Sequence, residues 1–132
     1  MAVFIDTSAF LAVLDAGDRN FEKARRAWEK LVGSAETLAC HNYVLVEASA
    51  LVQRRLGLAA LRALEEDVLP LVQTIWVDED VHRAAVGALL AAADRSLSLV
   101  DCVSFEVMRR HGIRTAFAFD AHFAERGFGA PV

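Results

Sequence analysis

The chain has 132 residues, a formal net charge of −4, and a hydrophobic fraction of 55%. This length fits a single domain, residues 1–132, that can bury a core without disulfide bonds. The acidic balance excludes a basic coat protein that binds nucleic acid by charge alone, but it allows a nuclease whose acids are neutralised by metal.

Strands and helices are predicted to alternate along the whole chain. Short apolar runs bounded by turn signals predict four strands, at residues 2–5, 37–40, 74–77 and 115–119. Helical spacing and capping residues predict helices at residues 7–14, 20–32, 42–55, 58–68, 78–94 and 98–111, followed by a short helical turn. This order predicts an α/β fold, a three-layer α/β/α sandwich with a short, mostly parallel central sheet.

Neither a secretion signal nor a membrane span is predicted. The N-terminus lacks a charged leader region and reaches Asp6 too soon for a signal peptide. The longest apolar run, at 84–93, is too short to cross a bilayer. Cys40 and Cys102 lie in apolar surroundings, which favours reduced, buried residues over a zinc site. We therefore expect a soluble cytoplasmic protein with no membrane partner.

Four carboxylates stand where the apolar pattern predicts burial. Asp6 and Asp120 end the first and last predicted strands, while Glu47 and Asp101 lie among apolar residues of predicted helices. Two such charges about 4 Å apart repel by roughly 4 kcal/mol at an effective dielectric constant near 20. Because the carboxyl ends of parallel strands meet at one edge, we predict that the four acids share a Mg²⁺ or Mn²⁺ site. An ion held there would activate water for attack on a phosphate, so the four acids are also the predicted catalytic residues.

Three of these acids have local explanations that remain open at this stage. Asp6 is placed to cap the helix that follows it. Asp101 lies three residues after Ser98, which matches a capping-box pattern with Asp in place of the usual Glu. Asp120 suits a turn at the end of a strand. Glu47 is harder to explain in this way, because it lies far from either end of its predicted helix.

Other polar side chains are candidates for supporting roles. The hydroxyl groups of Thr7, Ser8 and Ser104 lie near the acids in sequence and are placed to orient a carboxylate or the attacking water. Arg54 follows the helix glutamate by seven residues and is a candidate for a substrate phosphate contact, or for shielding the acids. His122 is a weaker candidate for a phosphate contact, because a loop histidine usually bonds to the backbone.

The acids and their neighbours, in their order along the chain, resemble a known family. The matching segments are Phe4–Ala9, Glu47, Leu99–Cys102 and Phe119–Phe123. Together they resemble the PIN domain, and within it the VapC-type toxin ribonucleases of bacterial toxin–antitoxin pairs. The resemblance implies an α/β/α sandwich that cleaves RNA endonucleolytically with Mg²⁺ or Mn²⁺, forms a homodimer and is blocked by a cognate antitoxin. Each of the four acids matches a family acid, and Asn20 stands where members often carry a histidine.

Two other classes of function remain open from the sequence. A Mg²⁺-dependent phosphatase or Toprim-like phosphoryl-transfer enzyme is favoured by Asp78 and Asp80, which follow a predicted strand. A phosphatase of the haloacid-dehalogenase type would need a second aspartate at the position of Ser8. The third possibility is a catalytically idle PIN fold that only binds RNA or a partner protein.

Overall fold

Four parallel strands form the centre of the computed structural model, which describes residues 1–131. The sheet has the order β3-β2-β1-β4, and every pairing in it is parallel. On the central strand, Val3 lies opposite Leu38 on one side and opposite Thr115 on the other. The strands are β1 (Ala2–Ile5), β2 (Thr37–His41), β3 (Gln73–Ile75) and β4 (Thr115–Phe117).

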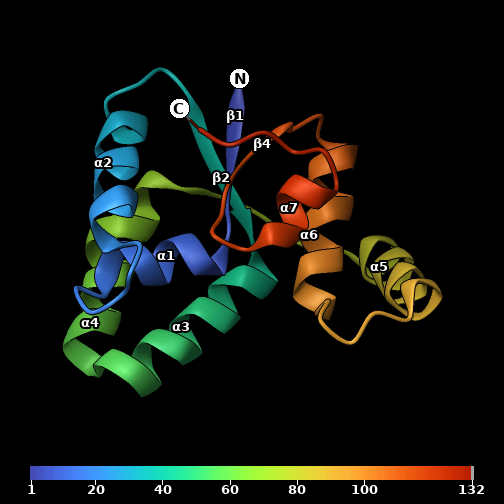
Figure 1. The fold of residues 1–132 in the computed structure, drawn as a ribbon, viewed down its shortest axis with the longest axis horizontal. Coiled ribbons are helices and arrows are strands. Elements are labelled where there is room, and N and C mark those ends of the chain that lie inside the picture. The colour runs from blue at the N-terminus through green and yellow to red at the C-terminus, as the bar shows by residue number, and fades with distance from the viewer. Residues whose placement is uncertain (132) are drawn as a thin grey trace.

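Helices cover the sheet on both sides. The α-helices are α1 (Thr7–Leu14), α2 (Phe21–Val32), α3 (Asn42–Leu56), α4 (Leu58–Ala63), α5 (Glu79–Ala92), α6 (Leu99–Arg110) and α7 (Ala121–Glu125). Figure 1 shows α1, α2 and α4 on one side of the strands and α5, α6 and α7 on the other. The predicted three-layer α/β/α architecture is therefore confirmed. Within residues 1–131, no helix combines the length and the apolar character needed to cross a membrane.

Several predicted elements end differently in the structure; for example, the strand predicted at 74–77 is β3 (Gln73–Ile75), and the helix predicted at 78–94 ends at Ala92. The helix predicted at 58–68 is α4 followed by a π-helical turn, η1 (Leu64–Val68), and a 3₁₀ turn, η2 (Leu69–Leu71). Pro70 fits the first turn of η2, where a backbone N–H has no helical partner. The strand predicted at 115–119 ends at Phe117, because the Phe119 N–H donates to the hydroxyl of Ser8 and not to another strand.

The core lies around β1 and the helices on its two faces. Phe4 and Ile5 of β1 are fully buried, and Phe10 of α1 packs into the same cluster. Across the sheet, the ring of Phe105 in α6 meets the ring of Phe123 in α7 edge-on, with centroids 5.0 Å apart. This contact fastens the short helix α7 to α6. Cys40 and Cys102 are both buried and unbridged, in agreement with their prediction as reduced hydrophobic residues.

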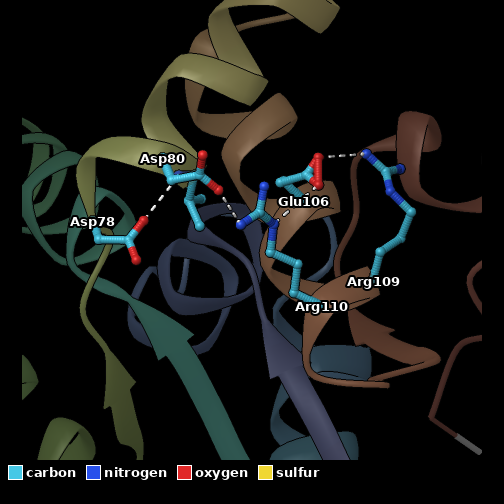
Figure 2. A network of polar contacts seen from close by, with 6 residues as sticks. Asp78, Asp80, Glu106, Arg109 and Arg110 are labelled. Atoms are coloured by element: carbon cyan, nitrogen blue, oxygen red, sulfur yellow. Dashed lines mark hydrogen bonds and ion pairs between the residues drawn. The ribbon is translucent and has the colours of Figure 1, made fainter.

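Ion pairs join α5 to α6 at the surface (Figure 2). Arg110 of α6 lies 2.6 Å from Asp80 at the start of α5, and it also contacts Glu106 one turn earlier in its own helix at 3.4 Å. Arg109 lies 3.5 Å from the other oxygen of Glu106. Glu106 is mostly covered, but Asp80, Arg109 and Arg110 are exposed, so solvent screens the ion pairs and they contribute little to stability.

The chain order places β1 at the point where the direction of the sheet reverses. Strands β1, β2 and β3 follow one another outward, and the chain then crosses to place β4 on the other side of β1. In parallel sheets, ligands bind outside the carboxyl ends of the strands at such a switch point. Asp6 follows β1 directly and Asp120 follows β4 after two further residues, so both acids flank this position.

Candidate active site

A surface cavity of about 470 Å³ lies at the carboxyl end of the sheet. All four predicted acids line it, although they come from four separate parts of the chain. We call this cavity the acid pocket. Its lining residues are Asp6, Thr7, Ser8, Leu11, Asp18, Asn20, Glu47, Leu51, Arg55, Ser98, Asp101, Phe119 and Asp120.

Asp6 is the most deeply buried acid of the pocket, with only 4% of its surface exposed. It is the N-cap of α1, and one of its oxygens, Oδ2, accepts hydrogen bonds from the Ser8 N–H at 3.1 Å and the Ser8 hydroxyl at 2.6 Å. Burial raises the pKa of Asp6 from 3.8 to about 6; the bonds from Ser8 oppose this shift, and the charges of Asp101 and Asp120 add to it. The effect of Asp101 and Asp120 on this pKa places three of the acids within electrostatic reach of one another.

Asp101 belongs to a capping box at the start of α6. The Ser98 hydroxyl accepts from the Asp101 N–H at 3.0 Å, and Asp101 Oδ2 accepts from the Ser98 N–H at 3.2 Å. The side chain is 8% exposed. Burial raises the pKa of Asp101, the backbone bond from Ser98 lowers it, and the negative charge of Asp120 raises it further. The capping box therefore holds a partly desolvated carboxylate at the wall of the pocket.

Asp120 and Glu47 complete the acid set and are each half-buried. Asp120 is the N-cap of α7 and accepts a hydrogen bond from the His122 N–H through Oδ1 at 2.9 Å. Glu47 lies in the middle of α3 and caps nothing. It lies beside the buried stripe of that helix and lines the pocket.

The local explanations hold for the three aspartates, and all three also line the same pocket. Each caps a helix, and each uses one oxygen to do so: Oδ2 of Asp6, Oδ2 of Asp101 and Oδ1 of Asp120. These bonds fix where the carboxylate stands, while its second oxygen accepts no hydrogen bond from the described residues. Three helix starts therefore converge on one pocket.

The donors of the pocket suit a hard divalent cation, but they do not form a finished cage. Carboxylate and hydroxyl oxygens are the ligands that Mg²⁺ and Mn²⁺ prefer. The buried Oγ1 of Thr7 adds a donor that has no hydrogen-bond partner among the described residues. Within residues 1–131, no three His, Cys, Asp or Glu side chains are already close enough together to hold an ion. Binding would therefore draw the free carboxylate oxygens inward.

The three predicted hydroxyl residues differ in where the structure places them. Thr7 and Ser8 line the acid pocket. The Ser8 hydroxyl donates to Asp6 and accepts from the Phe119 N–H at 2.9 Å, so it ties the first acid to the segment that leads to Asp120. Ser104 does not line the pocket.

Ser104 instead belongs to a fully buried contact between β2 and α6. Its hydroxyl donates to the Val100 carbonyl at 2.9 Å and lies 2.8 Å from His41 Nε2. The other ring nitrogen of His41 accepts from the Tyr43 and Val44 N–H groups and thereby caps α3. Burial lowers the pKa of His41 to about 4, which keeps the ring neutral. This contact links the helix that carries Glu47 to the helix that carries Asp101.

Of the two predicted phosphate contacts, neither lines the acid pocket. Arg54 is exposed, and the neighbouring Arg55 lines the pocket in its place. The His122 ring lies 3.2 Å from the Ser96 carbonyl through Nε2, which is the backbone role expected of a loop histidine. Asp18 and Asn20, from the loop before α2, also line the pocket. The sequence signal for this loop was Asn20, which stands where members of the family often carry a histidine.

The acids that favoured a Toprim-like enzyme have structural roles elsewhere. Asp78 is the N-cap of α5 and accepts from the Val81 N–H at 2.9 Å. Asp80 pairs with Arg110, and neither aspartate lines the acid pocket. The two aspartates that favoured a Toprim-like enzyme are therefore explained by their roles at the start of α5.

Comparison with known proteins decides the family. Residues 3–129 match the PIN domain. The chain belongs to the PIN-domain family. The resemblance predicted from the ordered acids is confirmed, because the matched region contains all four of them.

Two relatives of this PIN domain are informative. It is 35% identical over 127 residues to the "23S rRNA-specific endonuclease VapC20" of two Mycobacterium tuberculosis strains, covering 96% of this chain and 95% of the relative. The crystal structure of that species' VapC20, described as a sarcin–ricin loop cleaving toxin, has a TM-score of 0.86 at 34% identity and 96% coverage of both chains. FitAcB from Neisseria gonorrhoeae shares the fold alone, with a TM-score of 0.70 at 14% identity and coverage of 97% of this chain and 94% of that one.

Proposed function

We propose that this PIN domain, residues 1–132, is an endoribonuclease of the VapC toxin type that hydrolyses RNA phosphodiesters in the cytoplasm with Mg²⁺ or Mn²⁺. The observation that carries the proposal is the gathering of Asp6, Glu47, Asp101 and Asp120 around one pocket at the switch point of the sheet. Family membership and the identity to an rRNA endonuclease support the same reaction class.

The residues of the pocket have distinct tasks in this proposal. The three aspartates and Glu47 hold the ion, which when bound supplies an activated water and binds the scissile phosphate. Ser8 keeps Asp6 oriented through its two hydrogen bonds, and Thr7 offers its unpartnered hydroxyl at the same wall. The capping box at Ser98 prevents Asp101 from turning away. Fixed carboxylates lower the cost of organising the site when RNA arrives.

We propose a structured loop of 23S rRNA as the substrate class. The support is the printed specificity of VapC20, which spans nearly the same length of chain at 35% identity. Loops expose unstacked bases that side chains can reach, whereas a regular A-form helix keeps its bases paired and stacked. We also propose that the protein forms a homodimer and pairs with an antitoxin that covers the acid pocket, since toxins of this type are held inactive by such a partner.

A cleavage assay on a defined RNA tests the function. The substrate is a synthetic hairpin with the sarcin–ricin loop sequence, incubated with Mg²⁺, with Mn²⁺ or with EDTA, and the products are mapped by sequencing gel. We expect one dominant cut in the loop that needs the metal. Asp101→Asn should lower the cleavage rate at least about a hundredfold, because Asn keeps an oxygen for the capping box but loses the charge that the ion requires.

The matched control is Asp67→Asn, which removes an exposed carboxylate outside the acid pocket. It should cut the hairpin at the wild-type rate. If Asp101→Asn also cuts at that rate, the assignment of the acids is wrong. Hydrolysis of a small phosphomonoester with the RNA left intact would indicate a phosphatase, and metal binding without any cleavage would indicate an idle fold.

A further inference from the structure

The acid pocket has a large imbalance of charge. Five carboxylates line it, namely those of the four predicted acids and Asp18, whereas Arg55 is the one basic side chain of the lining within the described residues. A divalent ion offsets part of this negative charge, but an RNA substrate brings phosphates of its own. The position of Arg55, the single positively charged side chain of the lining, therefore bears directly on how the RNA phosphates are held.

The geometry of α3 explains why Arg55 reaches the pocket and Arg54 does not. The buried stripe of this helix is Val44, Ala48 and Val52. Glu47, Leu51 and Arg55 follow one another at intervals of four residues and all line the acid pocket, so they form one row beside this stripe, whereas Arg54 lies outside that row. Arg55 thus ends the row of pocket-lining side chains on α3, one turn beyond Leu51 and two turns beyond Glu47.

The guanidinium of Arg55 is not engaged by a neighbouring acid. No carboxylate within residues 1–131 lies within ion-pair distance of it, and its side chain is exposed. By contrast, Arg62, Arg83 and Arg110 each pair with an acid on their own or an adjacent helix. Arg55 therefore presents an unused planar donor, which suits bidentate bonding to a phosphate.

We propose that Arg55 binds a backbone phosphate of the RNA next to the one that is cleaved, and so sets the register of the strand across the acid pocket. The inference rests on the proposed ribonuclease function and deepens it. Leu51, one turn before Arg55 on the same wall, gives an apolar surface between the arginine and Glu47. The strand would thus run along α3 from the metal-binding acids toward the end of the helix.

The salt dependence of RNA binding tests this directly. Binding of the fluorescently labelled hairpin is measured by anisotropy at several KCl concentrations, with Asp101→Asn as the common background so that the RNA stays intact. Adding Arg55→Ala should weaken binding about tenfold. It should also reduce the slope of log affinity against log salt by about 0.7 to 0.9, the loss expected for one phosphate contact. Arg55→Lys should restore the slope but only part of the affinity, because lysine keeps the charge and loses the bidentate geometry.

Arg54→Ala is the charge-matched comparison, since it removes the same charge one residue earlier on the same helix. We expect the slope of log affinity against log salt for the Arg54→Ala protein to equal that of the Asp101→Asn background protein. Equal slopes for the Arg54→Ala and Arg55→Ala proteins would overturn the inference, whether both fall or neither does. If RNA is cleaved normally but the Arg55→Ala slope is unchanged, only the role of Arg55 is wrong. If the wild-type protein neither binds nor cleaves the hairpin, the proposed function fails as well.

Discussion

At the scale of single residues, the acid pocket is built from side chains that serve two purposes. Asp6 caps α1 through one oxygen and also lines the pocket. Ser8 supports Asp6 with two hydrogen bonds, and its hydroxyl also accepts from Phe119. Burial is the largest influence on the pKa of Asp6 and raises it, while the bonds from Ser8 lower it. Without these bonds the carboxylate would therefore be harder still to ionise.

The cost of this burial predicts an effect on stability. Asp6→Asn should stabilise the metal-free protein at pH 7, because Asn still accepts hydrogen bonds from Ser8 but carries no charge. Burial, with the charges of Asp101 and Asp120, raises the Asp6 pKa from 3.8 to about 6 against the bonds from Ser8. A pKa shift of that size lowers the free energy of unfolding at pH 7 by at most about 3 kcal/mol. Urea unfolding in EDTA should therefore give a free energy of unfolding about 1 to 3 kcal/mol above that of the wild type.

The sign of the pH dependence follows from the raised pKa. The folded protein keeps its proton on Asp6 up to about pH 6, whereas the unfolded chain releases it near pH 3.8. The wild type therefore loses stability at this site as pH rises from about 4 to 6, and the advantage of Asp6→Asn should shrink toward zero as pH falls below 4. A variant less stable than the wild type at pH 7 would contradict this. The free energy of unfolding of Asp67→Asn, the exposed control, should stay within about 0.5 kcal/mol of the wild-type value.

At this scale the sequence predicted the acids but not all of their neighbours. An acid within an apolar run is a strong signal, so all four were found. Arg54 was predicted because a spacing of seven residues from Glu47 returns to a similar helix face, whereas the structure places Arg55, eight residues after Glu47, in the pocket lining. The buried role of His41 could not be predicted, because its partner Ser104 is 63 residues away in the sequence.

At the scale of elements, the ends of helices position the site. Three acids stand at or near helix starts, and Arg55 stands near the end of α3. That end is formed by Gly57, whose φ of 91° and ψ of −178° fall in a region that is almost exclusive to glycine. The chain turns there directly into α4, so Gly57 determines where the last turn of α3 stops.

Two glycine substitutions should change the stability of the folded protein in opposite directions. Gly57→Ala should destabilise the protein by about 1 to 3 kcal/mol, because alanine is strained at this φ and ψ. Gly87→Ala should stabilise it by about 0.5 to 1 kcal/mol, since Gly87 lies within α5 and an added Cβ has no atom within 4 Å. Urea unfolding of both variants measures the difference, and changes of the same sign would contradict this reading of the backbone.

Most elements were predictable, whereas some of their ends were not. Residues 7–14 and the start of α6 at Ser98 follow from strong capping signals. The end of β4 at Phe117 depends on the bond from Phe119 to Ser8, which joins residues 111 positions apart in the sequence. The π-turn at Leu64–Val68 had no signal in the apolar spacing, which fits a continuous α-helix equally well.

At the scale of the whole molecule, the order of the strands creates the site. Because β4 returns to the far side of β1, the segments after these two strands meet, and α3 and α6 bring Glu47 and Asp101 to the same edge. The alternation of strands and helices predicted the parallel sheet, and the positions of Asp6 and Asp120 at strand ends predicted their meeting. The order β3-β2-β1-β4 itself depends on packing between distant segments and was not readable from local patterns.

We propose that acids from four separate segments bind one ion or one adjacent pair of ions. Calorimetric titration with Mn²⁺ tests it most directly, on the wild type and on Asp6→Asn, Glu47→Gln, Asp101→Asn and Asp120→Asn, with Asp67→Asn as the control. We predict saturable binding by the wild type and the control, and a loss of affinity of about tenfold or more in each of the four variants. Absence of binding by the wild type at millimolar Mn²⁺, or undiminished binding by all four variants, would contradict a shared site.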